Sequence, residues 1–413
     1  MPAPSTSPAV SQADLQRRLP AIIAGLSTLG PFAIDTYLPS FNSIGADLGA
    51  TPLQVQQTLT AYILPFAVMA LWHGALSDSL GRRRVVLIGL VLFSAASIGA
   101  AFSQSIEALW MWRALQGAVG GVGMTVGRAV VRDVADGPIA QRMLSQTTMM
   151  FALAPAIAPI LGGWLQTLAG WRSVFIFLAL ISLCLALLCW RMLPETLPPE
   201  KRQSMQPGPM ARAYRELATS GAFLRLAGAL ALNFAGFFVY VLAAPAFLTG
   251  VMGLGPREFA WMFIPAVAGT MIGAFLSSRL AGRLLPAASV KAGFGIMTAA
   301  VIINLTLALT MNPPRMPWAT LSLLLYNVGM GLAMAPLQVM LLDLFAHRRG
   351  MASSGMAFAQ SSGNALVAGL VAPLLWHSAV TMALGSMCAL AAGGLLFAWH
   401  LKTLRPSSAP DKP

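Results

Sequence analysis

Charged residues are scarce in this chain, since Asp, Glu, Lys and Arg make up only 9% of its 413 residues. A water-soluble globular protein carries about 25% charged residues. Hydrophobic residues reach 57% and the mean hydropathy is +0.72. So few charges cannot coat a soluble particle with polar surface. The composition therefore excludes a soluble globular domain and predicts an integral membrane protein.

Cysteine and histidine are also rare, with three and four residues. Cys184, Cys189 and Cys388 fall inside apolar runs and give no sign of a disulfide framework or a metal cage. The sequence has neither a GxxxxGK[ST] phosphate-binding loop nor an HExxH zinc motif. We therefore expect no cofactor, no metal site and no enzymatic activity.

Long apolar runs are what the chain has instead. A helix needs about 20 apolar residues to cross the hydrocarbon core of a bilayer. Runs of this kind predict an all-α membrane protein with twelve transmembrane helices, near residues 20–42, 54–76, 85–103, 106–128, 141–168, 171–193, 221–249, 257–279, 287–311, 317–342, 350–375 and 378–401.

The basic residues predict the orientation of these helices. With both termini on one side, that side holds 22 of the 26 Lys and Arg residues, and the opposite side holds Arg172, Arg257 and Arg315. Lys and Arg concentrate in cytoplasmic loops. We therefore expect both termini in the cytoplasm. The same asymmetry explains the net charge of +13 without a nucleic-acid partner.

A polar, proline-rich interruption divides the chain into two similar halves. Gly30, Phe32, Pro39 and Phe41 recur 206 residues later as Gly236, Phe238, Pro245 and Phe247. Parallel repeats of six helices build one large class of transporters, with the substrate site between the halves. We expect two pseudo-symmetric six-helix bundles with the boundaries 1–19 (cytoplasmic tail), 20–193 (first bundle), 194–220 (cytoplasmic linker), 221–401 (second bundle) and 402–413 (cytoplasmic tail).

Asp35 is the acidic residue that this topology places deep in the membrane. A charge there is costly and is usually functional. Rise per residue puts Asp35 and Arg113 at nearly the same depth, in the outer half of the bilayer. The position matching Asp35 in the second half is Val241, so the fold itself does not require an acid. We expect Asp35 to exchange the coupling proton and Arg113 to tune it; the alternative is a static buried pair that orders the first and fourth helices.

Three motifs support this assignment. The stretch "GALSDSLGRRRV" at 74–85 resembles the G-x-L-x-D-x-x-G-R-[RK] signature of the major facilitator superfamily, with Ser79 at the usual basic position. "RALQGAVGG" at 113–121 is similar to the family's R-x-x-Q-G motif, which is linked to proton transfer. "APAIAPILGG" at 154–163 resembles the antiporter motif G-P-x-x-G-G, with Ala158 in place of the first glycine.

Together with "IDTYLPSF" and "VGRAVVRDV", these motifs make the chain similar to the Bcr/CflA branch of drug:proton antiporters. The resemblance implies a conformational latch between the halves at Gly74, Asp78, Gly81, Arg82 and Arg83. It also implies an antiporter motif in the fifth helix, which the residues Pro155, Pro159, Gly162 and Gly163 make bendable.

The same resemblance implies proton-driven export of chloramphenicol-, florfenicol- or bicyclomycin-like compounds by a monomer in the lipid bilayer. A proton-coupled exporter of a sugar or amino acid is the close alternative, and a channel or membrane enzyme is a more distant one. In the family, the first, fourth, seventh and tenth helices line the central cavity. Candidate substrate contacts are Tyr37, Asn233, Phe237, Tyr240, Tyr326, Asn327 and Gln338.

Overall fold

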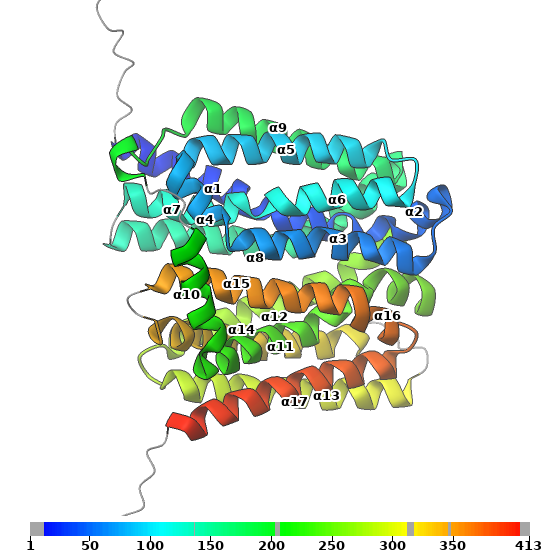
Figure 1. Ribbon diagram of the computed structural model, residues 1–413. Coiled ribbons are helices and arrows are strands. Elements are labelled where there is room, and N and C mark those ends of the chain that lie inside the picture. Colours follow the sequence, from blue (N-terminus) through cyan, green and yellow to red (C-terminus); the bar gives the residue numbers. More distant parts are fainter. Residues whose placement is uncertain (1–11, 136, 203–206, 312–317, 346–347, 405–413) are drawn as a thin grey trace, which may run out of the picture.

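A computed structural model of the chain describes residues 12–135, 137–202, 207–311, 318–345 and 348–404. Nearly all of these residues are helical, and most of the helices run along one common direction (Figure 1). Within the described residues, β pairing is limited to an isolated bridge between Ala281 and Leu284.

The first half contains six passages through the molecule. Proline and glycine interrupt several of them, so that one passage can hold more than one helix. In chain order the helices are α1 (Gln12–Asp35), η1 (Leu38–Ser40), α2 (Phe41–Leu48), α3 (Pro52–Ala70), α4 (His73–Leu80), α5 (Arg82–Ala101), α6 (Ile106–Gly120), α7 (Val122–Val134), α8 (Gly137–Ala169) and α9 (Trp171–Met192).

The second half repeats this plan with six further passages. Its helices are α11 (Gly221–Ala244), η3 (Pro245–Val251), η4 (Pro256–Phe259), α12 (Ala260–Leu280), α13 (Pro286–Thr310), α14 (Trp318–Asp343), α15 (Arg349–Leu366), η6 (Val367–Val371), α16 (Ala372–Leu375) and α17 (Ala379–Leu404). The segments η3 and η6 are π-helical.

Nine helices of the described chain are long and apolar enough to cross a membrane, or ten if α3 and α4, bent by 53°, count as one span. The two remaining passages are α6–α7, interrupted at Gly121, and α8, which contains Pro155 and Pro159. Both passages pack beside the apolar spans, because α6 contacts α3 and α5 while α8 contacts α1 and α9. The twelve-helix, two-bundle architecture predicted from the sequence is confirmed.

The two ends of the molecule differ in how the halves meet. We call the end with α4, α10 and the described chain ends Gln12 and Leu404 the α10 end, and the end with α2 and α16 the α2 end (Figure 1). The apolar core of the first half continues into the second at the α2 end, where it includes Phe247, Phe259 and Val367. A separate core fills the rest of the second half.

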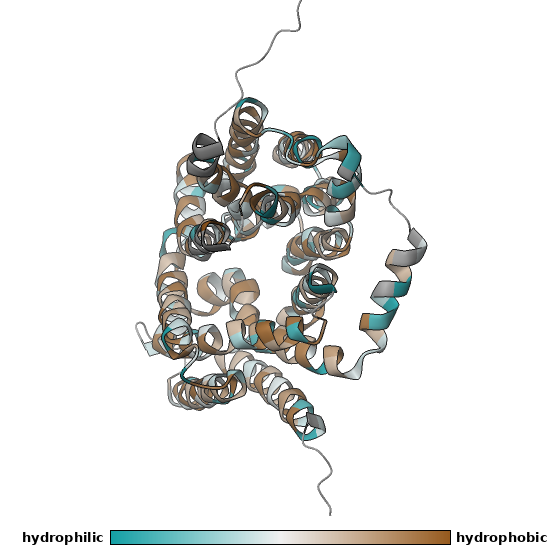
Figure 2. Ribbon diagram, turned by 90° about the vertical axis from the view of Figure 1, so that its left-hand side faces the viewer, coloured by the Kyte–Doolittle hydropathy of each residue, from teal (hydrophilic) through white to brown (hydrophobic). Residues whose placement is uncertain are grey.

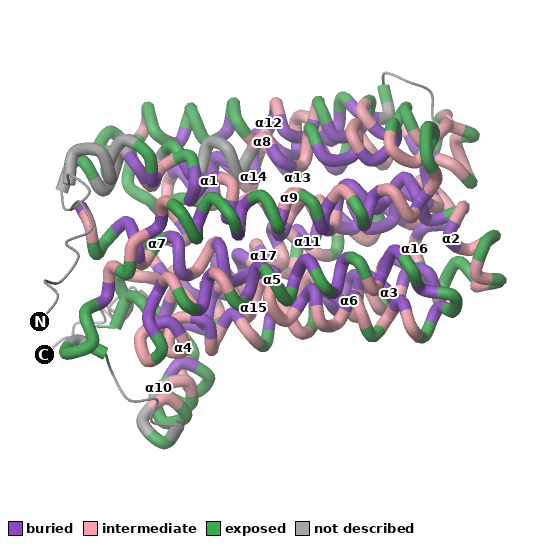
Figure 3. Tube along the Cα trace, turned by 90° about the horizontal axis from the view of Figure 1, so that it is seen from above, coloured by how far each residue is buried: buried purple, intermediate pink, exposed green. Residues whose placement is uncertain are grey.

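The segment between the halves contains an unexpected helix. The sequence predicted a polar linker at 194–220, and the structure forms η2 (Pro199–Lys201) and α10 (Pro207–Thr219) there. Helix α10 stands outside the bundles and bridges them at the α10 end (Figures 2 and 3). Leu217 anchors it in the core of the second half, and the Tyr214 hydroxyl donates to the Leu71 carbonyl, 3.0 Å away, in the first. Its polar composition hid this amphipathic helix from a search for apolar runs.

Candidate functional site

Asp35 occupies the last position of α1, where the helix ends inside the molecule. The sequence had placed it in the middle of a continuous helix over 20–42, and this expectation was wrong. Pro39 has no N–H to donate to the Asp35 carbonyl four residues earlier, and the α-helix ends at Asp35. The chain turns at Thr36 and Tyr37 before η1 begins. Asp35 is only 5% exposed.

Arg113 projects from α6 into the same region and is fully buried. Its Nη1 donates to the carbonyl oxygen of Ala33, 3.0 Å away, and to Oε1 of Gln116, 2.8 Å away. Gln116 in turn donates to Oγ of Ser97 on α5, at 2.6 Å. This chain of hydrogen bonds fixes the guanidinium against α1, two residues before Asp35.

Aromatic rings surround the rest of the Arg113 side chain. The guanidinium carbon lies 4.4 Å from the ring centre of Tyr62, 4.8 Å from that of Tyr37 and 6.0 Å from that of Phe175. A cation over the face of a desolvated ring is stabilised by about 2 kcal/mol. The rings and the Ala33 carbonyl therefore offset part of the cost of burying this cation.

Asp35 and Arg113 are close in the fold without being paired. In the described part of the chain, no ion pair of 4.0 Å or less involves Asp35, and Nε and Nη2 of Arg113 have no hydrogen-bond partner. The guanidinium thus keeps two free donors beside the end of α1. The coupling role of both residues stays a prediction.

Tyr37 belongs to this cluster rather than to an open cavity. Its hydroxyl forms a hydrogen bond of 2.5 Å with Oγ1 of Thr58 on α3, and its ring packs against Phe41 and Phe175. The residue is fully buried. In this conformation Tyr37 supports Arg113 and does not reach a substrate.

The loop signature folds around Arg82 at the α10 end. Arg82 pairs with Asp78 at 2.5 Å and with Asp133 at 3.2 Å, and its backbone N–H donates to Glu195 at 2.8 Å. Arg83 donates to the carbonyl of Trp190 at 2.5 Å. All these partners belong to the first half or its boundary with the linker, so the predicted latch between the halves stays a prediction.

The two glycines of this signature have different environments. Gly81 has φ +98°, and a Cβ atom added there would overlap the carboxylate of Glu195, so glycine is required. A Cβ added to Gly74 would meet nothing within 4 Å. Gly74 therefore makes no close helix contact in this conformation.

The antiporter motif lies on α8, which continues through Pro155 and Pro159 as one helix. A Cβ added to Gly162 would overlap the carbonyl of Thr36, the residue after Asp35, and one added to Gly163 would overlap the carbonyl of Pro256 in η4. Gly162 therefore lets α8 contact the backbone just after α1, and Gly163 lets the opposite side of α8 contact the backbone of the second half.

The second-half substrate candidates are placed in three different settings. Asn233 is fully buried, its side-chain amide has no partner, and its carbonyl accepts from the Tyr326 hydroxyl at 3.0 Å. Asn327 bonds to Leu323 and to Thr270, at 2.8 and 3.2 Å, so it joins α14 to α12. Phe237 and Gln338 are half-buried.

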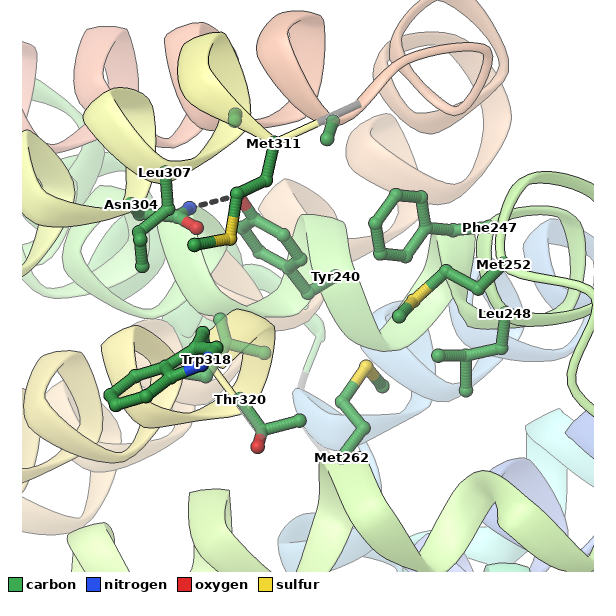
Figure 4. Close-up of a pocket in the computed structure, with 13 residues that line it drawn as sticks. Tyr240, Phe247, Leu248, Met252, Met262, Asn304, Leu307, Met311, Trp318 and Thr320 are labelled. Carbon is green, nitrogen blue, oxygen red and sulfur yellow. Dashed lines mark hydrogen bonds between the residues drawn. The ribbon is translucent and has the colours of Figure 1, made fainter. Parts of the chain in front are cut away.

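Tyr240 points into the second bundle, away from the interface between the halves. Its hydroxyl forms a hydrogen bond with Asn304 on α13 rather than with Arg113 or Asp35. This bond lies beside a small pocket lined by Met252, Met262 and Trp318, among others (Figure 4). The cavity volume is about 20 Å³, which is room for a water molecule but not for a drug. The role of Tyr240 as a substrate contact stays a prediction.

Several residues of the site were missed by sequence reasoning. Tyr62, Gln116, Ser97 and Thr58 support Arg113 and Tyr37 from neighbouring helices. Gln116 stands inside the quoted R-x-x-Q-G motif, so its role as the partner of Arg113 was readable from the i, i+3 spacing on one helix face. The other three lie on different helices, and no local pattern marks them.

The fold and the buried site define a polytopic membrane transporter, and comparison with known proteins identifies its family. Residues 21–368 match the profile described as Major Facilitator Superfamily. The chain belongs to the Major Facilitator Superfamily. It therefore transports a small molecule and is not an enzyme.

Curated relatives fall in the same family. The chain is 31% identical over 335 residues to the uncharacterized MFS-type transporter YdgK of Bacillus subtilis (strain 168), covering 81% of this chain and 83% of the relative. It is 30% identical over 259 residues to a bicyclomycin resistance protein homolog of Haemophilus influenzae, with 63% and 65% covered. It is 27% identical over 388 residues to multidrug resistance protein MdtL of Escherichia coli O9:H4, with 94% and 96% covered.

Solved structures share the fold at low identity. A D-xylose-proton symporter matches with a TM-score of 0.71 and 16% identity over 93% of this chain and 96% of that chain. A bacterial homolog of the human lysosomal transporter Spinster, solved in an inward-facing conformation, matches with a TM-score of 0.67 and 17% identity over 96% and 99%.

The first testable prediction concerns the contact between α6 and α3. A Cβ added to Gly117 would overlap the carbonyl of Tyr62, so Gly117→Ala must push the two helices apart. Overpacking costs about 1–3 kcal/mol, and we expect a lower thermal midpoint of the detergent-purified protein. Gly295→Ala on α13 is the matched control, because a Cβ there meets nothing within 4 Å. Equal midpoints for both variants would contradict the packing described here.

Proposed function

We propose that the protein is a proton-coupled exporter of small, largely apolar drugs such as chloramphenicol-, florfenicol- or bicyclomycin-like compounds. The observation that carries the proposal is a buried acid, Asp35, left without an ion pair beside the free donors of Arg113. The names of relatives, which include bicyclomycin resistance and multidrug resistance, support drugs as the substrate class.

The orientation follows from the charges and the chain ends. Helix α10 and the described chain ends Gln12 and Leu404 lie at one end of the molecule (Figure 1). The loop with Arg82 and Arg83 lies there as well. Because basic loops stay in the cytoplasm, the α10 end faces the cytoplasm of the bacterial inner membrane. The core that joins the halves at the α2 end then closes the periplasmic side.

In this coupling, the protonation state of Asp35 decides whether its side chain bonds to Arg113. When Asp35 carries a proton, it has no charge to offer Arg113, and the two side chains remain apart. When the proton leaves toward the cytoplasm, the carboxylate can bond to Nε or Nη2 of Arg113, and the end of α1 is drawn toward α6. The position of α1 therefore depends on the proton, and α1 contacts α8 at Thr36 and Gly162.

The second prediction tests the acid. Asp35→Asn keeps the size and hydrogen bonding of the side chain but cannot release a proton, so cells expressing it should lose drug resistance to the level of cells without the protein. A drug-susceptibility panel and proton flux in proteoliposomes measure this loss, with expression checked on blots.

Asp47→Asn is the matched control for that experiment. Asp47 lies on the same passage and pairs with Arg172 at 2.5 Å, but its side chain is 45% exposed. This variant should retain resistance and proton flux. A fully active Asp35→Asn transporter would contradict the assignment of Asp35 as the proton site. Equal losses of resistance and proton flux in both variants would contradict it as well.

The third prediction tests the shape of the cation. Arg113→Lys keeps the positive charge but cannot bond to Ala33 and Gln116 while keeping donors free for Asp35. A lost charged hydrogen bond costs about 1.5–3 kcal/mol, which corresponds to about a tenfold to hundredfold lower rate of drug-dependent proton flux. Wild-type flux in this variant would show that charge alone suffices and that the planar guanidinium has no coupling role.

A further inference from the structure

The passage formed by α15, η6 and α16 contains an unusual backbone arrangement. Its α-helix gives way to a π-helical turn at Val367–Val371, followed by α16 with Pro373 as its second residue. Proline has no N–H, so it cannot donate to the carbonyl of Gly369 four residues earlier, or to that of Ala368 five residues earlier. The missing N–H leaves this pair of carbonyls one backbone donor short, and because unsatisfied backbone groups are costly inside a membrane, outside donors stabilise the turn.

Two glutamines of the first half supply those donors. Nε2 of Gln56 lies 3.3 Å from the Ala368 carbonyl oxygen, and Nε2 of Gln57 lies 3.1 Å from that of Gly369. Gln56 is 1% exposed, so its amide is committed to this contact. Both glutamines lie near the start of α3, at the α2 end, and their side chains cross directly between the two halves.

A side-chain contact between the halves also lies at the other π-helical segment. The π-helical η3 begins at Pro245, whose carbonyl accepts from the Thr249 hydroxyl. Oγ1 of Thr249 in turn accepts from Nδ2 of Asn42 in α2, 2.9 Å away. Nearby, the guanidinium of Arg257 lies 4.2 Å from the ring centre of Trp164 on α8, which also crosses between the halves.

We propose that Gln56 and Gln57 form the outer gate latch, which holds the α2 end closed by bonding to the carbonyls released by Pro373. The inference rests on the alternating access of the proposed function, but not on the chemistry of Asp35. When the gate opens, hydrogen bonds to water replace the bonds of Gln56 and Gln57 to the two carbonyls. The glutamine bonds therefore break only as water enters the α2 end. The proline makes this exchange possible because it keeps Ala368 and Gly369 from being satisfied within their own helix.

The fourth prediction measures opening of the gate away from the mutated residues. Amide hydrogen exchange of segment 245–259, which includes η3 and η4, is followed by mass spectrometry in lipid nanodiscs. Gln57→Leu and Gln56→Leu should each raise the exchange rate there by about twofold to tenfold, because a typical hydrogen bond shifts an opening equilibrium by this factor. Pro373→Ala should raise it as well, since the restored N–H satisfies the helix from within.

Two comparisons make the result specific to the latch. Gln360→Leu makes the same substitution on α15, outside the latch, and should leave the exchange of 245–259 unchanged. Gln57→Leu should add little in the Pro373→Ala background, because its acceptor is then already satisfied. Unchanged exchange in both glutamine variants, an equal rise in Gln360→Leu, or full additivity with Pro373→Ala would each overturn the proposal.

The gate and the proton site can fail separately. The exchange experiment uses no drug and no pH gradient, so it reports the latch even if the protein exports something other than a drug. Loss of resistance in Asp35→Asn together with unchanged exchange in the glutamine variants would retain the proposed function and reject the latch. If Pro373→Ala does not fold, the two glutamine variants and Gln360→Leu still decide the question.

Discussion

Backbone hydrogen bonding without water is the constraint on which this structure depends. Each proline inside a passage removes a donor, and the carbonyl that it releases must be satisfied by another part of the protein. Pro39 ends α1 at Asp35, Pro245 turns α11 into a π-helix, and Pro373 follows a second π-helix. The cluster around Asp35 and the contacts of Asn42, Gln56 and Gln57 with the second half lie near these three points.

The two halves use this constraint in different ways, although their plan is the same. The first half contains the buried charges, and it satisfies Arg113 with the Ala33 carbonyl, Gln116 and aromatic rings. The second half has Val241 at the position matching Asp35; it offers the Thr249 hydroxyl to Asn42 and backbone carbonyls to Gln56 and Gln57. The halves therefore differ at this position, where the first has a buried acid and the second has an apolar residue.

The twelve passages could be predicted from the sequence because long apolar runs follow directly from the thickness of a bilayer. Details that depend on packing between helices could not. The break of α1 at Asp35 was signalled by Pro39, but a single proline does not say whether a helix kinks or ends. Helix α10 is too polar for a search by hydropathy, and the inward turn of Tyr240 depends on Asn304, which is 64 residues away. The internal repeat pairs Pro39 with Pro245. It does not mark Gln56 and Gln57 as donors to the carbonyls before Pro373.

Helix α8 connects the end of α1 at Asp35 to the second half without any charged group of its own at the contact. Gly162 fits against Thr36, directly after Asp35, while Gly163 fits against Pro256 in the second half. Packed backbones transmit a shift because the interior has few voids to absorb it. A displacement of Thr36 therefore carries to α8, which in turn contacts Pro256 of η4. Gly162 and Gly163 face opposite partners. A displacement at the end of α1 therefore passes through α8 to the contact between the halves.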